Sequence, residues 1–553
     1  MAVRRCGHMV LTMAFAYLHV FAEPIVELCE TNLLQRDLVL RTDAESALRS
    51  GANNSAFFVW HTDAHVDPFY LTDLRECQKR NLTLLEAHPF GIMSCDPPER
   101  LLRSAFAASA RIGAPNASFV LYTGDFVRHA IRQMPDPYEN ASQIVANVSR
   151  AAKEAFEDLP VLFGTLGNSD SREDYYQELT DNESSNPWFE KLGSAIHSQG
   201  GMKPEVLEQF TYGSYYETRE GQLTILSLAT VIYSVDHLPY GPLEKDPFGQ
   251  FRWLRQRLQL AAADGRHVWI VGHISPGIET FAYTELWYPQ YVEAYLEIVQ
   301  DPVLGPWIAA QLFGHAPGSG RRGDPVHKDE LRLLPEPPAS AGPIFLSSSL
   351  SPVYYNNPSF KLVEYDPISG RLLNLQTFIS DRFEAPEADW IFGYDHLKQY
   401  GLAGLSMAEL QNFTERLLEG GESYERYASW YASGYPNELE HYSLKAANWN
   451  ATWKWQRRRQ YVCALVIRTA EDFENCSGTQ VLRSWQLPFM ERFDRLILGR
   501  LWSWAQGSSL PLAQQIKHLA AANQWEELLR LFKGLVEWSL QSGTPLESAL
   551  LTA

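Results

Sequence analysis

Basic residues are scarce in this chain of 553 amino acids, which has 47 Lys and Arg against 66 Asp and Glu and a formal net charge of −19. Nucleic-acid-binding proteins usually present a basic stripe, so this balance argues against general nucleic-acid binding. It also disfavours a polyanionic substrate unless positive charge is concentrated in the site itself. The chain has no internal repeat and no low-complexity tract, and its length is compatible with two to four domains.

Long hydrophobic runs are equally scarce. The one strong apolar stretch runs from Met9 to Phe21, after Arg4-Arg5, and Val20-Phe21-Ala22 resembles a small-residue cleavage site. Residues 1–22 are therefore predicted to be a secretory signal peptide. The stretch is short for a membrane span, which needs about 20 apolar residues, although an uncleaved anchor stays open. No later segment is long and apolar enough to cross a bilayer.

Cysteine is also rare, with six residues and no C-x-x-C pair, so cysteine metal ligands are not expected. Sequons, by contrast, are frequent, and their density predicts a glycoprotein of the secretory pathway, located outside the cell or in a lysosome- or vacuole-like lumen. The acceptor residues are Asn53, Asn81, Asn116, Asn140, Asn147, Asn182, Asn412, Asn450 and Asn475.

Five short polar motifs each follow a hydrophobic run. They are His61-Thr62-Asp63-Ala64-His65, Gly124-Asp125, Gly167-Asn168, Gly272-His273 and Gly314-His315. Short apolar runs bounded by glycine are typical of strands in a sheet that is covered on both faces. We therefore expect buried strands at residues 56–60, 119–122, 161–163, 268–271 and 310–313. Ligands of open α/β sheets lie beyond the carboxyl ends of the strands, so the five motifs should converge there.

The residue types of these motifs suit a site for two metal ions. Two divalent cations roughly 3.5–4 Å apart can hold a phosphoryl group and activate a shared water. Mixed carboxylate and imidazole ligands fit zinc, our first choice, or iron or manganese, better than calcium or magnesium. One ion would be bound by Asp63, His65 and Asp125, and the other by Asp125, Asn168, His273 and His315.

At these residues the chain resembles the calcineurin-like metallophosphoesterases, whose pattern is D-x-H, GD, GN-H-D/E, GH and GH-x-H. Within that superfamily it is similar to the acid sphingomyelinase-like phosphodiesterases and the endopolyphosphatases. Further similar stretches are Asp67-Pro68-Phe69-Tyr70, Cys95-Asp96-Pro97-Pro98 and Ser351 to Phe360. The resemblance covers about residues 55–480. It implies an α/β fold, a four-layer αββα sandwich with a C-terminal helical subdomain.

The resemblance also implies roles for individual residues. Asp125 would bridge the two ions, and His129 would be the general acid that protonates the leaving group. We expect disulfides between Cys77 and Cys95, which bracket an insertion, and between Cys463 and Cys476, whose separation resembles a late disulfide of sphingomyelinase-like enzymes. Cys29 is left over, either free or paired with another chain.

Two positions depart from the family pattern. The histidine expected after Gly167-Asn168 is Ser169, and the last histidine ligand is replaced in Gly314-His315-Ala316-Pro317. Endopolyphosphatases resemble this chain in both respects and in Arg128-His129. Four polar residues beyond His315 could bind phosphate or replace the ligand, although a solvated loop is the simpler interpretation. They are Arg321, Arg322, Asp324 and His327.

The predicted organisation has five parts. Residues 1–22 are the signal, 23–52 a leader too short for a saposin-type domain, 53–380 the metallophosphoesterase domain, 381–480 the helical subdomain and 481–553 a helical tail. The end of the main domain should contain antiparallel strands around residues 344–346, 360–363 and 372–375. Part of the tail has a helical apolar stripe, which more often packs on a protein's own core than on a membrane or partner. Its residues are Ile516, Leu519, Leu528, Leu531, Leu535 and Trp538.

Three functions are compatible with the sequence. The first is a secreted or lysosome/vacuole-type phosphoesterase that cleaves phosphodiester or phosphoanhydride bonds with a hydroxide bridging two ions. The second is an endopolyphosphatase, and the third a catalytically weakened binding glycoprotein. A phosphorylated small molecule, a lipid or polyphosphate is the expected substrate class, and the sequence leaves the oligomeric state open.

Overall fold

The computed structural model describes residues 55–78, 80–180, 185–239, 243–280, 283–315, 330–335, 341–385, 388–436, 451–479, 481, 511–521 and 531. All of them fall in one compact unit, Ser55–Ala553. The predicted signal and leader, Cys29, the residues Arg321 to His327 and most of the tail lie outside the described residues, as do Asn53, Asn182 and Asn450.

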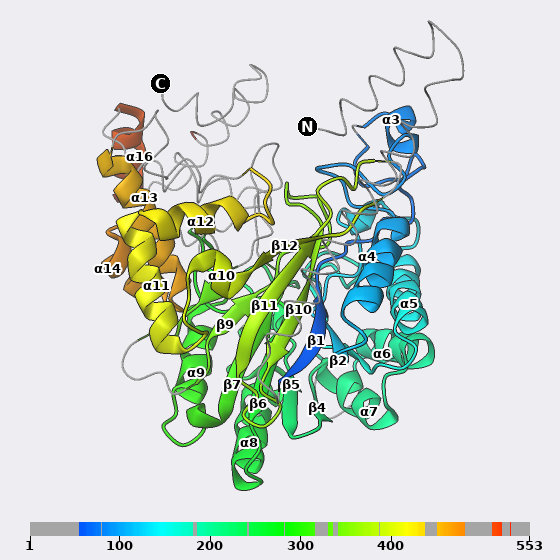
Figure 1. Cartoon of the computed structure of the whole chain (residues 1–553), viewed down its shortest axis with the longest axis horizontal. Helices are drawn as coiled ribbons and strands as arrows, with labels where there is room; N and C mark the ends of the chain where they lie inside the picture. Colours follow the sequence, from blue (N-terminus) through cyan, green and yellow to red (C-terminus); the bar gives the residue numbers. More distant parts are fainter. Residues whose placement is uncertain are drawn as a thin grey trace, which may run out of the picture. The chain divides into compact units, whose positions relative to one another are not determined.

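Two six-stranded sheets form the centre of this unit (Figure 1). The first sheet has the order β12-β11-β10-β1-β2-β3 and the second β4-β5-β6-β7-β9-β8. The strands of the first are β1 (Ala56–His61), β2 (Ala117–Tyr122), β3 (Val161–Phe163), β10 (Ser359–Tyr365), β11 (Leu372–Ile379) and β12 (Ile391–Asp395). Those of the second are β4 (Tyr216–Glu220), β5 (Leu223–Ser227), β6 (Val268–Gly272), β7 (Ile308–Phe313), β8 (Glu330–Arg332) and β9 (Ile344–Leu346).

The strands that precede the motifs are parallel to one another within each sheet. In the first sheet β1 pairs in parallel with β2 and β2 with β3, and in the second β5, β6, β7 and β9 pair in parallel. The carboxyl ends of these strands therefore point the same way within each sheet. All five strands predicted from the sequence are confirmed. The late strands β10 and β11 are antiparallel as predicted, whereas β9 is antiparallel only to β8 and runs parallel to β7.

The two sheets pack face to face through aromatic side chains. Phe58 of β1 lies 4.9 Å from Trp269 of β6, measured between ring centroids, and Phe119 of β2 stacks on Phe58. The alternation along a strand explains this contact, since Phe58 and Trp60 point into the interface while Val59 and His61 point to the opposite face. His61 there hydrogen-bonds Ser109 of a covering helix.

Helices cover the outer faces of both sheets, which gives the four-layer α/β sandwich expected from the sequence (Figure 1). The helices beside the first sheet are α4 (Glu99–Ile112), α5 (Pro137–Ala155) and α6 (Pro187–Gly200). The short α3 (Leu82–Glu86) lies in the insertion after β1, and α7 (Pro204–Gly213) contacts α6 and β4 of the second sheet. The helices beside the second sheet are α8 (Gln250–Ala263) and α9 (Pro289–Val299). Asn186 and Pro187 show why α6 begins where it does, because the Asn186 side chain accepts from Trp188 N and proline suits a first helical position.

A set of helices follows the last strand. They are α10 (His396–Tyr400), α11 (Met407–Glu419), α12 (Glu422–Trp430), α13 (Ala451–Leu465) and α14 (Ala470–Ser477), with α16 (Pro511–Ala521) later in the chain. Their tyrosines join the same core as the sheets, and the Tyr431 hydroxyl donates to the buried Glu330 of β8. In α16, Ile516 and Leu519 of the predicted stripe are buried. Among the described residues, no helix is both long and apolar enough to span a membrane.

Candidate metal centre

The predicted ligands lie just beyond the carboxyl ends of five strands. Asp63 follows β1, Asp125 follows β2, Asn168 follows β3, His273 follows β6 and His315 follows β7. Because β1, β2 and β3 belong to one sheet and β6 and β7 to the other, both sheets contribute to a single site.

Four of the predicted ligands have a left-handed backbone. The φ angles are 51° at Asp63, 43° at His65, 58° at Asp125 and 44° at His315. Residues other than glycine rarely adopt this conformation, and in proteins such residues concentrate at functional sites. The conformation turns the chain sharply at the end of each strand, so that the side chain points into the site.

Asp125 lies at the centre of the group. Its Oδ2 atom is 3.4 Å from Nε2 of His65 and 3.0 Å from Nε2 of His273. Two sets of potential ligand atoms, each within 4.8 Å of one another, share this carboxylate: Asp63, His65 and Asp125 form one, and Asp125, His273 and His315 the other. This is the arrangement expected of a carboxylate that bridges two cations.

Backbone carbonyl groups set the tautomers of two histidines. Nδ1 of His65 is 3.0 Å from the Val127 carbonyl oxygen, and Nδ1 of His273 is 2.7 Å from that of Thr123. A carbonyl oxygen can only accept, so both Nδ1 atoms donate a hydrogen. In each neutral ring Nε2 is then left with a lone pair directed to the centre, as in most metal-bound histidines.

Asn168 is held by a residue that the sequence did not single out. Its Nδ2 donates to Asp174 Oδ1 at 2.7 Å, and its Oδ1 lies 3.2 Å from Nε2 of His273. Asp174 therefore orients the amide so that its oxygen, the atom that binds cations, faces the centre. His315 is linked to the other set of ligands, because its backbone N–H donates to Asp63 Oδ2 at 3.3 Å.

Asp170 supports the loops that carry these ligands. Its carboxylate accepts hydrogen bonds from the backbone N–H groups of Asp125, Phe126, Val127 and Gly167, at 2.7 to 3.1 Å. Position 167 accepts only glycine, because the Cβ of any other residue there would collide with the Asp125 carboxylate. The GD and GN motifs are thus joined into one rigid unit by a buried side chain that is not itself a ligand.

Electrostatics of the centre favour bound cations. Burial raises the pKa of Asp63 to about 7, and the nearby Asp125 carboxylate adds to this. Burial acts on Asp125 in the same direction, but His273 and His65 outweigh it and hold its pKa below the usual range. Burial alone would lower the pKa of His273, but Asp125 outweighs it and raises the pKa to about 9, so a cation bound at Nε2 would displace a proton from this ring. Two buried carboxylates side by side are costly unless positive charge neutralises them.

The donor set fits divalent cations. Carboxylate oxygens, an amide oxygen and imidazole nitrogens are all present. The second polar atoms of His65, His273 and Asn168 are hydrogen-bonded to the backbone or to Asp174. This mixture suits zinc, iron or manganese. Residues 316–329, which include the position of the replaced last histidine, lie outside the described residues.

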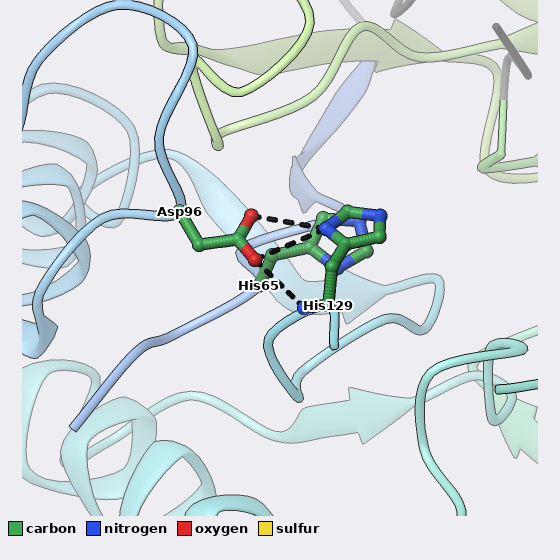
Figure 2. Close-up of side chains that lie close together, drawn as sticks. All are labelled: His65, Asp96 and His129. Carbon is green, nitrogen blue, oxygen red and sulfur yellow. Dashed lines mark hydrogen bonds and ion pairs between the residues drawn. The ribbon is translucent and has the colours of Figure 1, made fainter. Parts of the chain in front are cut away.

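His129 lies beside the ligands rather than among them (Figure 2). Its Nδ1 is 3.0 Å from Asp96 Oδ1, and its backbone N–H donates to Asp96 Oδ2 at 2.7 Å. Its Nε2 is 2.5 Å from the Tyr354 hydroxyl. Burial alone would lower the pKa of His129, but the Asp96 carboxylate outweighs it and raises the pKa to about 10. The imidazole is thus protonated at neutral pH, and 19% of its side chain is exposed.

Some of the residues discussed from the sequence are occupied elsewhere. Arg128 is fully buried, and its guanidinium binds Asp67 Oδ1 at 3.0 Å and the backbone oxygens of Leu74 and His129. It is therefore a structural residue and not a phosphate ligand. Ser169, at the position of the family histidine, donates its backbone N–H to Asp125 Oδ1, and its Oγ has no hydrogen-bond partner among the described residues.

The two predicted disulfides form in the structure. Cys77 is bonded to Cys95 with Cα atoms 5.4 Å apart, and Cys463 to Cys476 with Cα atoms 5.9 Å apart. The first links the insertion that contains Asp96 to the segment after β1. Of the described sequons, Asn81, Asn116, Asn412 and Asn475 are exposed, and Asn140 and Asn147 are partly so.

Asp96, Asp170, Asp174, Tyr175 and Tyr354 were not assigned roles from the sequence. Asp170 and Asp96 each lie within a recognised motif, Gly167-Asn168-Ser169-Asp170 and Cys95-Asp96-Pro97-Pro98, and motif membership was the available signal. Tyr354 lies in the similar stretch from Ser351 to Phe360. No pattern marks Asp174 or Tyr175, because their role depends on how the loop after Asn168 folds back.

No protein-family model matches the chain. Curated proteins with similar sequences include sphingomyelinase phosphodiesterase D of Dictyostelium discoideum, 28% identical over 63% of this chain and 76% of that protein. Acid sphingomyelinase-like phosphodiesterase 3b of Mus musculus is 26% identical over 66% of this chain and 81% of its own length. Cyclic GMP-AMP phosphodiesterase SMPDL3A of Rattus norvegicus is 25% identical over 75% of this chain and 91% of its own length.

Solved structures resemble the chain only distantly. A dimetal phosphatase from Danio rerio covers 62% of this chain and 99% of its own, with a TM-score of 0.35 and 13% identity. The sequence relatives, by contrast, match this chain over 76% to 91% of their own length. The chain is therefore a homologue of the acid sphingomyelinase-like phosphodiesterases.

Proposed function

We propose that this phosphoester hydrolase is a metal-dependent phosphodiesterase that acts at the centre around Asp125. The observation that supports this most directly is the position of one carboxylate oxygen, Asp125 Oδ2, between the Nε2 atoms of His65 and His273. A single oxygen placed between two such nitrogens is suited to two cations at once. Two bound divalent cations would polarise the phosphoryl oxygens and lower the pKa of a water held with them.

The chain's own residues then have separate tasks. Asp63 and His65 would bind one cation, and Asn168, His273 and His315 the other, with Asp125 shared between them. Asp170 holds the two loops together, and Asp174 orients the Asn168 amide. Because these supporting bonds already exist in the protein, the ligands need little rearrangement to bind.

His129 would supply the proton for the leaving group. Its Nδ1–H is held by Asp96, so the proton available for transfer is on Nε2, which faces the Tyr354 hydroxyl. In the reaction the leaving oxygen of the substrate would replace that hydroxyl as the acceptor. The raised pKa keeps the imidazole protonated at mildly acidic and neutral pH, which is the state a general acid requires.

The test is hydrolysis of bis-p-nitrophenyl phosphate by the purified full chain between pH 4.5 and 8. We expect turnover that is abolished by a chelator and restored by zinc, iron or manganese. Elemental analysis should find two ions per molecule, and Asp125→Asn should contain fewer, whereas the exposed helix residue Glu86→Gln should match the wild type. Turnover that is absent at every pH, or unaffected by full metal removal, would contradict the proposal.

Endopolyphosphatase activity is the second candidate. The small residue at Ser169 is compatible with it, because the histidine of the family pattern is absent there. The burial of Arg128 weighs against it, since that side chain is committed to Asp67 and cannot serve polyphosphate. Long-chain polyphosphate that stays intact on a gel, while a phosphodiester is cleaved, would rule it out.

We also propose that the chain functions in the secretory pathway or in a lysosome- or vacuole-like lumen. Two disulfides and four exposed sequons support this, because disulfides persist mainly in oxidising compartments. Protein purified from a eukaryotic host should lose mass on treatment with an N-glycosidase. No mass change, together with free thiols at Cys77 and Cys95, would contradict the location.

A further inference from the structure

Tyr175 is a phenol placed at the edge of the candidate metal centre. Its hydroxyl is 3.4 Å from Nε2 of His315, and the two rings meet edge to face with centroids 6.0 Å apart. The bond is long for a hydrogen bond, so it does not by itself explain why a tyrosine stands there. Any oxyanion held against the ligand nitrogens would come within reach of this hydroxyl.

The backbone of Tyr175 is strained to place the ring. Its φ angle is 61°, a conformation that is a genuine outlier for a bulky side chain. The strain is maintained from both sides, because Tyr175 N donates to the Asn168 carbonyl oxygen at 2.8 Å and its carbonyl accepts from Leu238 N at 3.0 Å. Strained residues that the surroundings hold in this way concentrate at active sites.

The preceding residue of the same loop already serves the centre. Asp174 accepts from the Asn168 amide, as described above, so two consecutive side chains point to the ligands. Ser169, at the start of the loop, cannot provide a further donor to substrate because its side chain is buried beside Asp125. Tyr175 is partly exposed and is therefore accessible to a bound molecule.

Tyr175 and His129 adjoin different ligands of the centre. Tyr175 adjoins His315, whereas His129 stacks on His65 with ring centroids 4.0 Å apart. Each can donate a hydrogen bond, one from a hydroxyl and the other from an imidazole. A phosphoryl group held between them would have its leaving oxygen near His129 and a non-bridging oxygen near Tyr175.

We propose that the Tyr175 hydroxyl donates a hydrogen bond to a non-bridging phosphoryl oxygen of the substrate. The proposal rests on the function proposed above. In this role Tyr175 stabilises the negative charge that the phosphoryl oxygens carry in the transition state, as hydrogen-bond donors do in oxyanion-binding sites. No proton is transferred from Tyr175, and no bond to it is made or broken.

The experiment compares Tyr175→Phe with Tyr176→Phe. Both variants lose one phenol hydroxyl, but the Tyr176 ring is covered by the guanidinium of Arg172 and has no contact with the ligands among the described interactions. In the metal-reconstituted full chain we expect Tyr175→Phe to lower kcat/KM about 100-fold. Tyr176→Phe should leave it within about twofold of the wild type, the range expected of a surface substitution.

Two readouts separate this role from others. Inorganic phosphate, titrated calorimetrically into the metal-reconstituted protein, should bind about 10-fold more weakly to Tyr175→Phe. The loss in kcat/KM should be the same for diesters with p-nitrophenol and with alkyl leaving groups, because the hydrogen bond is to a non-bridging oxygen. Metal content and melting temperature should be unchanged.

Three results would overturn the proposal. The first is equal phosphate affinity in Tyr175→Phe and the wild type. The second is a loss of bound metal in Tyr175→Phe, which would make the phenol a ligand or a support of His315. The third is a loss that grows with the pKa of the leaving group, which would place Tyr175 at the leaving oxygen. A wild type that neither turns over diesters nor binds phosphate would instead contradict the proposed function.

Discussion

The imidazole of His129 stacks on that of His65, with the planes inclined by 28° (Figure 2). This contact places a protonated ring directly against a predicted metal ligand. His129 lowers the pKa of His65, in addition to the larger effect of burial, to about 4. His65 is therefore neutral at neutral pH, the form in which imidazole binds metals, while its neighbour retains the proton that catalysis needs.

Replacement of His129 should affect substrates according to their leaving group. His129→Gln is expected to lower kcat about 100-fold for a diester with an alkyl leaving group, which needs protonation. For a p-nitrophenyl diester, whose leaving group is stable as an anion, the decrease in kcat should be much smaller. Steady-state kinetics on both substrates provide the check, with His197→Gln on α6 as the control. An equal loss on both would argue that His129 only supports the site.

The Asp96 carboxylate sets the pH range over which His129 is an acid. A general acid supports turnover below its pKa, and activity falls as pH rises through that value. Asp96 raises the pKa of His129 to about 10. Deprotonation of His129 should therefore cause no decline in the kcat of the wild type at neutral pH. Asp96→Asn removes the carboxylate charge, so the decline should move to lower pH. The kcat–pH profile measures this, and an unchanged profile would contradict it.

Asp170 should matter for stability more than for chemistry. Asp170→Asn replaces one of the two acceptor oxygens by an amide nitrogen, which cannot accept, so two of the four buried N–H groups lose their partner. We expect a loss of about 2 to 3 kcal/mol in the free energy of unfolding. Urea denaturation checks this, with Asp264→Asn at the exposed end of α8 as a control. If both variants unfold at the same urea concentration, the hydrogen bonds to Asp170 contribute little to the free energy of unfolding.

Asp174 should control metal affinity through Asn168. Without Asp174 the Asn168 amide is free to rotate, and its nitrogen can then face the centre in place of its oxygen. Loss of such a supporting bond typically weakens metal affinity 10- to 100-fold, and we expect Asp174→Ala to do so, by about 10-fold or more, for one of two ions. Competition with a chromogenic chelator can resolve the two affinities. If both affinities stay at the wild-type values, Asn168 is oriented by other contacts.

The strands and the motifs behind them could be predicted because each depends on a short segment. An apolar run that ends in a short polar motif predicts a strand and the turn after it, and all five strands predicted in this way are confirmed. The pairing of β9 was only half foreseen, because its parallel pairing with β7 joins positions far apart in the sequence, such as Gln311 and Ile344. The six predicted ligands do lie together, and their role as ligands stays a prediction.

The supporting residues could not be assigned in the same way. Asp96 reaches His129 across 33 positions, and Asp170 reaches Asp125 across 45. Arg128 was part of the resemblance to endopolyphosphatases, but its guanidinium turns inward to Asp67. The direction of a long side chain depends on which charge is buried near it, and the local sequence does not contain that information.

The amino-acid sequence by itself determined the chemical identity of the donors, the order of the motifs and the strands that end at them, because these follow from local periodicity and residue type. Tertiary structure alone decided that one oxygen of Asp125 faces two histidines, that Asp96 holds the proton on His129 and that Tyr175 stands beside His315. The Asp125–His273 and Tyr175–His315 relationships join segments of two different sheets, and the packing of Phe58 and its neighbours against Trp269 holds those sheets together.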